Sequence, residues 1–373
     1  MTNPFIISGS IPRHLFCDRE LESKKLIDNI TGGQNTTLIA ERRMGKSKLI
    51  DYCFSAKEVE NGYFTFYIDL LHTTSLQEFV YEFGNEVFKQ LQKASDTLLS
   101  KFILALKSLR TNFEYDPISG KPQFSISLGE IEKPEITLSE IFSTLSAAPK
   151  RCIVAFDEFQ QITSYPEKNI EALLRSYIQR ADNANFIFAG SERHIISQMF
   201  LSAAHPFYNS TNLINLHAIP LDKYTQFVIS CMSMMNKTID ADDIKYVYTL
   251  VDGNTYCMQK IFHEALYATP DAICTHNILC KTITNIIDDF KDIYQRTLSG
   301  LTLRQKEVIY AIASDGKATK ILSTDFIKKH TLSTASSVQA AVRKLSELNL
   351  ITTDGESYVV TDQFFRLYLT QKN

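Results

Sequence analysis

The chain has 373 residues, of which 44% are hydrophobic and 22% are charged, values near the average of globular proteins. This composition excludes disorder, collagen and coiled coil as the main architecture, and the length predicts two or three domains. The net charge of −3 excludes a nucleic-acid polycation over the whole chain, although a single domain can still be basic.

The first 220 residues alternate short β-prone runs with helical stretches. The β-prone runs are residues 36–40, 63–70, 152–157, 185–190 and 212–216. Strands that alternate with helices predict parallel βαβ units, and hence a three-layer α/β domain over residues 1–220. Residues 110–137 hold three of the ten prolines and interrupt this alternation, so we expect an excursion there with a short strand or hairpin.

The rest of the chain divides into two further parts. Residues 221–300 have helical periodicity, which predicts a helical, lid-like subdomain whose last stretch, residues 277–298, forms one long helix. Residues 301–373 contain three helix candidates followed by two β-prone runs around the turn at Asp354 and Gly355. Three helices followed by a hairpin are typical of a winged-helix domain.

Cysteine, histidine and hydropathy patterns exclude several kinds of site. The seven cysteines are scattered and include no CxxC pair, which argues against a disulfide framework or a zinc site and favours the reducing cytoplasm. The eight histidines are dispersed, and no Cys/His pair stands at a spacing typical of a nucleophilic site. We expect no signal peptide and no membrane segment, because no apolar run approaches ~18 residues.

The loop after the first predicted strand carries the strongest chemical signal. It comprises Ala40, Glu41, Arg42, Arg43, Met44, Gly45, Lys46, Ser47 and Lys48, and it matches G-x-x-x-x-G-K-[ST] except at Ala40. Backbone N–H groups at a helix N-terminus bind phosphates, Gly45 permits close approach, and Lys46 reaches the β- and γ-phosphates. The Ser47 hydroxyl suits Mg²⁺. The alternative is a basic, solvated turn.

Two further predicted strands end in residues that suit phosphoryl chemistry. Asp157 and Glu158 follow four apolar residues, at the strand end where open α/β sheets bind ligands. Asp157 suits Mg²⁺ beside Ser47, and Glu158 suits the base that activates the attacking water. A solvated acidic pair is the alternative. Ser191 follows the next strand and suits either a sensor of the γ-phosphate or the N-cap of the following helix.

Several arginines are candidates for stabilising charge in the transition state. They are Arg42, Arg43, Arg175, Arg180 and Arg193. Arg180 precedes the predicted strand at 185–190, a position from which an arginine finger can reach the nucleotide of a neighbouring subunit. A surface charge is the alternative for each of them.

The motifs together resemble the prokaryotic AAA-type ATPases of the archaeal-ATPase branch, which are relatives of the STAND NTPases. The matching segments are FCDRE at 16–20, LIAERRMGKSKLI, CIVAFDEFQQI and FIFAGSERHIISQMF. The resemblance covers nearly the whole chain and implies an ASCE-type P-loop core that uses ATP and Mg²⁺. It also implies that Phe16, Asp18 and Arg19 pack near the adenine, where an N-cap and first helical turn are the alternative. The chain departs from the family at Thr255, where a Gly-x-Pro-like turn commonly has proline.

The predicted recognition helix of the winged-helix domain, residues 334–348, suits contact with DNA. Ser336, Gln339, Arg343 and Lys344 are types that contact bases or phosphates. Its buried face is expected at Ala335, Val338, Ala341, Val342, Leu345 and Leu348. Residues 301–373 hold ten basic and seven acidic residues, a net charge of +3. Since this excess is mild, packing on the ATPase core or on a protein partner is the alternative.

Three functional hypotheses remain open from the sequence. The first is an ATPase, slow without a partner, whose hydrolysis moves the helical and winged-helix domains. The second is a nucleotide-locked, STAND-like switch whose output is a protein partner or a homo-oligomer. The third is a DNA-binding regulator that uses the ATPase core as a scaffold. None of the three involves a membrane.

Overall fold

The computed structural model describes residues 2–106, 108, 114–115, 122–123 and 131–371. The chain forms two compact units. The sheet unit comprises Glu20–Glu41 and Lys46–Leu216, and the helical unit comprises Met1–Arg19, Arg42–Gly45 and His217–Asn373. The middle of the predicted phosphate loop therefore belongs by its contacts to the helical unit, while both ends of the loop belong to the sheet unit.

The sheet unit is built on five parallel strands in the order β2-β5-β6-β1-β7. Their bounds are Thr36–Ile39 for β1, Tyr63–Asp69 for β2, Arg151–Asp157 for β5, Ala184–Gly190 for β6 and Asn212–Asn215 for β7. Every residue of β6 and all but the first of β5 are buried, as expected for central strands that are covered on both faces.

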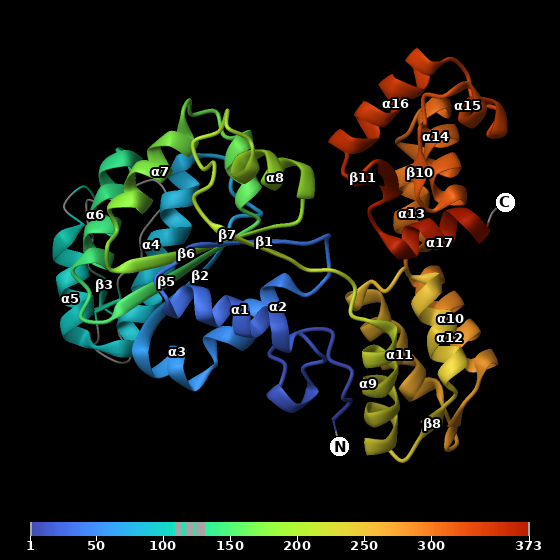
Figure 1. Ribbon diagram of the computed structural model, residues 1–373, viewed down its shortest axis with the longest axis horizontal. Helices are drawn as coiled ribbons and strands as arrows, with labels where there is room; N and C mark the ends of the chain where they lie inside the picture. Colours follow the sequence, from blue (N-terminus) through green and yellow to red (C-terminus); the bar gives the residue numbers. More distant parts are fainter. Residues whose placement is uncertain (1, 107, 109–113, 116–121, 124–130, 372–373) are drawn as a thin grey trace. The chain divides into compact units, whose positions relative to one another are not determined.

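Helices cover both faces of this sheet and complete the predicted three layers (Figure 1). One face carries α1 (Glu20–Thr31), α2 (Lys46–Phe54) and α3 (Lys57–Gly62), and the other carries α4 (Leu76–Ala94), α6 (Pro134–Ser146) and α7 (Ile170–Arg180). The unit also contains α5 (Asp96–Ala105), the 3-10 helix η3 (Phe159–Ser164) and α8 (Arg193–Leu201). Phe79 and Phe83, one turn apart on α4, each place a ring centroid 5.2 Å from that of Phe156 on β5. The α/β prediction is confirmed.

The predicted excursion at 110–137 is shorter at its C-terminal end than expected. Helix α6 begins at Pro134, because a proline in the first turn loses no helical hydrogen bond. Strands β3 (Glu114–Tyr115) and β4 (Pro122–Gln123) pair antiparallel. The remainder of the strand predicted near Gln123 lies outside the described residues.

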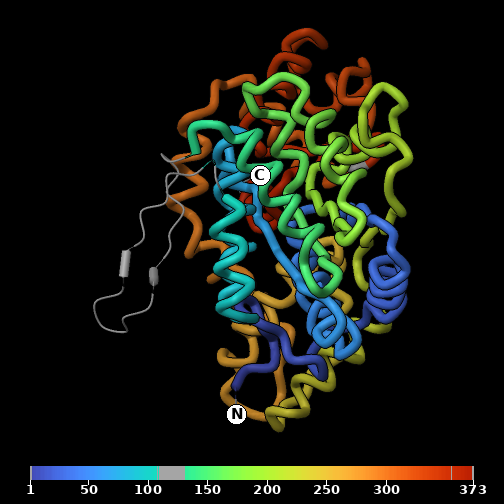
Figure 2. The backbone as a smooth tube through the Cα atoms, turned by 90° about the vertical axis from the view of Figure 1, so that its left-hand side faces the viewer, coloured from blue at the N-terminus to red at the C-terminus, as the bar shows by residue number. Residues whose placement is uncertain are grey.

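The helical unit begins with an N-terminal arm that packs against distant helices. The Phe5 ring lies 6.1 Å from Phe227 and 5.7 Å from Phe262, between ring centroids. In Figures 1 and 2 the dark-blue arm, which contains the 3-10 helix η1 (Arg13–Leu15), lies beside the yellow helices. The later elements are α9 (Leu221–Met234), β8 (Thr238–Ile239), α10 (Ala241–Leu250), α11 (Thr255–Ala268), β9 (Ile273–Cys274), α12 (His276–Asp289) and α13 (Lys291–Ser299). The prediction of a single long helix at 277–298 is wrong, because the helix breaks at Phe290 between α12 and α13.

The winged-helix domain has the predicted three helices and hairpin. They are α14 (Leu303–Asp315), α15 (Thr324–Lys329), α16 (Ala335–Glu347), β11 (Ile351–Asp354) and β12 (Ser357–Val360), to which β10 (Ala318–Thr319) and α17 (Gln363–Gln371) are added. On α16 the expected buried face is confirmed at its four central positions. Ala335 and Leu348 are instead exposed, because they lie at the two ends of the helix. Tyr294 on α13 stacks near Phe365 of α17 at 4.9 Å, so one core joins the helices to the winged-helix domain.

Candidate active site

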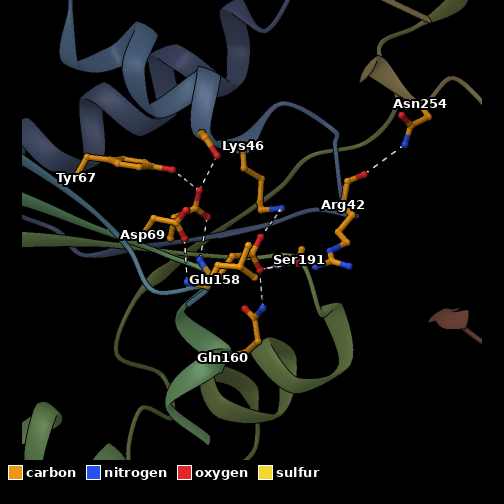
Figure 3. Close-up of polar contacts among 11 residues, drawn as sticks. Arg42, Lys46, Tyr67, Asp69, Glu158, Gln160, Ser191 and Asn254 are labelled. Carbon is orange, nitrogen blue, oxygen red and sulfur yellow. Dashed lines mark hydrogen bonds and ion pairs between the residues drawn. The ribbon is translucent and has the colours of Figure 1, made fainter. Parts of the chain in front are cut away.

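The carboxyl ends of four strands meet at one edge of the sheet. In the parallel register Asp69 of β2 stands opposite Asp157 of β5, and Ile39 of β1 stands opposite Gly190 of β6. The segments that follow these strands are therefore neighbours, although they are far apart in the sequence. Figure 3 shows their polar side chains converging.

Ser47 and Asp157 form the hydroxyl–carboxylate pair expected for a magnesium site. Ser47, the second residue of α2, donates its hydroxyl to Asp157 Oδ2 at 2.6 Å, and Asp157 is buried. The Tyr67 hydroxyl donates to the same oxygen at 2.5 Å. Burial, followed by the Asp157 charge, raises the pKa of Tyr67, so this phenol stays protonated as a donor. Hard oxygen donors of this kind fit Mg²⁺, which takes further ligands from phosphates and water.

Glu158 is held by three groups in a left-handed backbone conformation. Its Oε2 accepts from the Ser191 hydroxyl at 2.6 Å, from the Ser191 N–H at 3.2 Å and from Gln160 Nε2 at 2.6 Å. The Lys46 Nζ lies 3.9 Å from the other oxygen. Glu158 has φ 52° and ψ 41°, a conformation that costs a non-glycine residue about 1 kcal/mol or more. These contacts offset that cost and fix the carboxylate.

Ser191 contacts Glu158 and does not cap the next helix. The N-cap of α8 is Glu192, so the N-cap alternative is wrong, and the Ser191 hydroxyl binds the Glu158 carboxylate, while its role as a sensor of the γ-phosphate stays a prediction. Gly190, just before it, permits the close approach of η3. A Cβ on Gly190 would lie 2.3 Å from Ile196 Cγ1 of α8 and 2.5 Å from Gln160 Oε1 of η3, so a larger residue would require these side chains to shift.

Asp69 adds a third carboxylate beside Asp157 and Glu158. Burial raises the pKa of Asp69 above its ordinary value, and the charges of Asp157 and Glu158 raise it further. The N–H of Leu71 donates to Asp69 Oδ1 at 2.9 Å and acts in the opposite direction. This edge of the sheet is therefore strongly acidic and suits a cation.

The ends of the phosphate loop have the backbone that the motif requires. Lys46 is the first residue of α2 and is 5% exposed, so its ammonium group lies inside the site. Gly45 has φ 90°, which favours glycine. Ala40 has no positive φ, and its N–H donates to the Gly190 carbonyl at 3.4 Å. An alanine in place of the usual glycine therefore introduces no backbone strain.

The carbonyls in the middle of the loop are bound by the N-terminal turn of α11. Asn254, the N-cap of α11, donates its side-chain amide to the Arg42 carbonyl at 3.3 Å. The N–H of Tyr256 donates to the Arg43 carbonyl at 3.2 Å. The turn that departs from the family at Thr255 therefore touches the loop through its polar groups.

The Arg43 side chain makes two further contacts within the helical unit. Its guanidinium lies 4.6 Å from the centre of the Tyr256 ring, and it forms an ion pair with Asp362 at 3.0 Å. Arg43 has φ 65°, a second left-handed non-glycine residue at this site. Asp362 lies just before α17, so this pair joins the loop to the winged-helix domain.

Two other charged residues of the loop pair within the sheet unit. Glu41 binds Arg193, the first residue of α8, with 3.3 Å between Oε1 and Nη1. Lys48 lies 3.4 Å from Asp51, one turn further along α2. The described contacts of Arg193 and Lys48 are thus with carboxylates of the protein, and their roles toward a nucleotide stay predictions.

Arg180 stands at the opposite edge of the sheet from the carboxylates. It ends α7 and is exposed, shortly before β6 begins. Ser191 follows the other end of β6, and a strand of this length spans roughly 20 Å. Arg180 therefore does not reach the site of its own chain, which leaves the predicted role toward a neighbouring subunit as the one to test.

The residues predicted to pack near adenine belong to the helical unit. Asp18 and Arg19 have φ 54° and 75°, and the buried Arg19 donates to the His217 carbonyl at 2.6 Å. Arg19 therefore ties the N-terminal arm to the start of the C-terminal half of the chain. The adenine role of Phe16, Asp18 and Arg19 stays a prediction.

Three residues of the site were not found from the sequence. The aromatic run at 63–70 indicates only a core strand, yet Tyr67 turns its hydroxyl to Asp157. Gln160 follows Glu158 by two residues, a spacing that identifies no role by itself. Asn254 precedes the Thr255 departure, and no local pattern places it beside a loop more than two hundred residues earlier.

The predicted DNA-contacting residues lie on the solvent side of α16. Ser336, Gln339, Arg343 and Lys344 are all exposed. Both cations bind Glu347 one turn later, with N–O distances of 3.1 Å and 3.2 Å. The face is therefore available to solvent, and part of its positive charge is compensated on the same helix.

No group of three or more His, Cys, Asp or Glu side chains in the described part of the chain is arranged to hold a metal ion. The Ser47–Asp157 pair, for which magnesium binding stays a prediction, is of a different kind, since it offers one hydroxyl and one carboxylate. Over the same described ranges, no helix combines the length and apolarity needed to cross a membrane.

Solved structures share this fold over almost the entire chain. The Walker-type ATPase PABY2304 of Pyrococcus abyssi is 19% identical, with a TM-score of 0.66 and coverage of 98% of this chain and 99% of that one. The Aeropyrum pernix ORC2 protein, in its ADPNP–ADP complexes, is 11% identical, with a TM-score of 0.57 and coverage of 99% and 98%. The Aeropyrum pernix ORC1 protein in complex with DNA is 11% identical, with a TM-score of 0.52 and coverage of 96% and 93%. At these identities the likeness shows the fold alone.

A search of curated proteins found no match, but two family models match separate parts of the chain. A probable winged helix domain matches residues 292–371, and an ATPase domain predominantly from Archaea matches residues 16–261. The second match covers more than half of the chain and includes the phosphate loop, the paired carboxylates and Ser191. The resemblance inferred from the motifs is confirmed, and the chain belongs to this family of ATPase domains, with a winged-helix domain at its C-terminal end.

Proposed function

We propose that this protein is a Mg²⁺-dependent ATPase that hydrolyses ATP to ADP and phosphate. The observation that carries the proposal is the set of hydrogen bonds that fix Glu158 beside Lys46, next to the Ser47–Asp157 pair. A fixed carboxylate next to a phosphate-binding lysine and a magnesium pair suits the activation of water for phosphoryl transfer.

Each residue has a defined task in this proposal. The N–H groups of the loop and Lys46 hold the phosphates, and Ser47 and Asp157 hold the metal. Magnesium, when bound, neutralises charge on the phosphate oxygens. Glu158 accepts a proton from the attacking water, and Ser191 holds Glu158 in place. Arg180 suits a finger that acts on a second copy of the chain, so turnover by the isolated protein is slow.

Nucleotide binding is proposed to act on the helical unit through the loop. The contacts of Asn254 and Tyr256 with the loop carbonyls, and of Arg43 with Asp362, support this coupling. Phosphate bound by the N–H groups of the loop changes the orientation of the same peptide groups whose carbonyls these residues hold. We expect Arg43→Ala and Asp362→Ala to change ATP affinity by similar factors and the double variant to add little, as coupled residues do. Additive effects in the cycle contradict the coupling.

The experiment that tests the ATPase measures ATP binding and phosphate release in the same sample, with wild type and Glu158→Gln. Removal of a general base lowers the rate about 10²- to 10⁴-fold. We expect phosphate release to fall by this factor while ATP still binds. Glu60→Gln, the same change on the exposed side of α3, is the control and keeps the wild-type rate. Unchanged release in Glu158→Gln contradicts the proposal.

A switch is the second candidate, and the three partners of the Glu158 carboxylate favour it. With Ser191, Gln160 and Lys46 around it, this carboxylate can stay engaged after ATP binds. A wild type that binds ATP tightly and releases no phosphate supports the switch, with output through a protein partner or a homo-oligomer. DNA is the third candidate, which the exposed face of α16 and the DNA complex of the ORC1 protein support.

A further inference from the structure

A thiol, an imidazole and a carboxylate form a chain on the surface of the helical unit. Cys280 Sγ lies 3.4 Å from His276 Nε2, and His276 Nδ1 lies 2.6 Å from Asp243 Oδ1. His276 and Cys280 are one turn apart on α12, and Asp243 lies in the first turn of α10. The sequence alone predicts no functional Cys/His pair, and the spacing of four residues becomes meaningful only because both lie on one face of a helix.

The order of these groups gives the imidazole a defined role. A carboxylate at Nδ1 accepts the N–H on that side, so the neutral ring presents its free lone pair at Nε2. Nε2 faces the sulfur and can take the thiol proton. The Tyr246 ring packs edge-on against His276, at 4.7 Å between centroids, and its hydroxyl lies 3.9 Å from the sulfur. The imidazole is thus oriented from two sides.

The other cysteines differ from Cys280 in burial. Five of the seven are buried: Cys53, Cys152, Cys231, Cys257 and Cys274. Burial raises the pKa of Cys152 and of Cys231 to about 12, which keeps these thiols protonated and unreactive. Cys17 and Cys280 are half-buried, so Cys17 is a natural reference for a thiol of similar exposure.

A groove of about 270 Å³ opens beside the thiol, between α10, α12 and α17. Its lining includes Cys280 and Tyr246, four aliphatic side chains and three polar ones, namely Leu250, Ile283, Ile287, Leu367, Thr284, Thr370 and Gln371. The four aliphatic side chains can bind the apolar part of a small molecule, while the sulfur in the lining meets its reactive group. The groove therefore favours a reagent with an apolar body.

We propose that Cys280 is a reactive thiol that exchanges with small, apolar disulfides. His276 takes the thiol proton, and the Cys280 sulfur attacks one sulfur of the disulfide. The disulfide bond breaks as the new S–S bond forms, and the departing thiolate receives the proton from His276. The product is a mixed disulfide on Cys280 and one free small thiol. Asp243 is the positioning residue of this site, which is independent of the ATPase proposal.

The test uses the full chain and the apolar aromatic disulfide 4,4′-dithiodipyridine, whose released thiopyridone is followed by absorbance. We expect a fast phase of one thiol that is lost in Cys280→Ser and kept in Cys17→Ser. Mass spectrometry of the modified peptide locates the adduct. His276→Gln keeps a polar side chain but removes the base, and we expect its fast phase to slow by about tenfold.

Two further readouts separate proton transfer from a change in access. The rate of the fast phase is expected to change its dependence on pH in His276→Gln and in Asp243→Asn, which a merely structural role does not require. Thermal melting confirms that each variant is folded. The proposal is overturned if Cys280 reacts no faster than Cys17, or if His276→Gln reacts at the wild-type rate in a folded protein.

Discussion

The carboxylate site and the exposed face of α16 both contain charged pairs, and they differ in what surrounds those pairs. At the site, Lys46 and Asp157 are about 95% buried, and Glu158 is fixed by three groups from different elements. On α16, Arg343 is 84% exposed and shares Glu347 with Lys344, all on one helix. The first arrangement requires the whole sheet, and the second requires only a helical turn.

This difference indicates how much each charge contributes to the stability of the fold. Buried ionic groups lose hydration and depend on their partners, so removal of one partner has a large effect. Exposed pairs along a helix contribute little to stability. A charge on α16 is therefore available to a ligand at small cost, whereas a charge at the carboxylate site is already part of a fixed arrangement.

Lys46→Ala is expected to have the largest effect. Loss of one partner of a buried charge pair costs about 2–5 kcal/mol of binding free energy, so we expect the Kd for ATP to rise by more than about 30-fold. Equilibrium titration with labelled ATP and Mg²⁺ measures the change. Lys57→Ala, on the exposed start of α3, is the matched control and leaves the Kd unchanged. Equal affinity in Lys46→Ala and wild type would contradict the expectation that a buried charge at the site has a large effect.

Gln160→Ala is expected to lower the hydrolysis rate by about tenfold, because one of the groups that fix Glu158 is lost. ATP affinity should stay the same, since Gln160 contacts the carboxylate. Gln161→Ala is the control, because the adjacent amide binds the Thr73 carbonyl instead. A matching loss of rate in both variants would show that η3 as a whole, and not this contact, matters.

Removal of Arg343 and Lys344 tests whether the exposed charges of α16 are available to DNA. If the face binds DNA, the double alanine variant lowers the salt dependence by about two counterions, with a slope closer to zero. The free energy of unfolding should change by less than about 0.5 kcal/mol. Arg304→Ala, which breaks a similar exposed pair with Glu307 on α14, is the control. An unchanged salt slope argues for a protein-facing role of this domain.

Asp69→Asn gives the smallest expected effect. The pKa of Asp69 is raised in the folded state. At pH values below its ordinary pKa of 3.8, Asp69 therefore stabilises the fold, and it loses this contribution as the pH rises through the raised pKa. The Asp69→Asn variant does not lose stability in this way, because asparagine does not titrate. We expect its stability relative to wild type to increase by about 0.5 kcal/mol between about pH 4 and pH 7, a figure reduced by solvent screening. Urea unfolding at both pH values measures it, and a constant difference contradicts the pKa assignment.

The sequence predicted the strands, the phosphate loop and the acidic pair because each is a local pattern. Four apolar residues before Asp157 and a G-K-S turn before a helix need no knowledge of the rest of the chain. The winged helix was likewise visible from its order of helices and hairpin. The break at Phe290 is not predicted, since the apolar periodicity continues through it and only the backbone, with ψ 0° at Phe290, reveals the interruption.

The partners of the site were less predictable because they depend on sheet order and on long-range contacts. Tyr67 reaches Asp157 since β2 is the neighbour of β5, which the sequence does not state. Asn254 reaches the loop across more than two hundred residues. Arg180 precedes β6 and therefore lies at the end of the strand opposite to Ser191, so its role depends on a second copy of the chain, which the sequence does not describe.

The packing of the N-terminal arm has a consequence for the order of events during synthesis. Phe5 leaves the ribosome long before its partners Phe227 and Phe262 are made. At ordinary rates of translation the arm waits roughly 10–50 s with an aromatic side chain uncovered. The sheet unit, in contrast, is complete by Leu216. At that stage the nascent chain contains all five strands of the sheet together with an exposed apolar arm, and we expect a chaperone to matter most there.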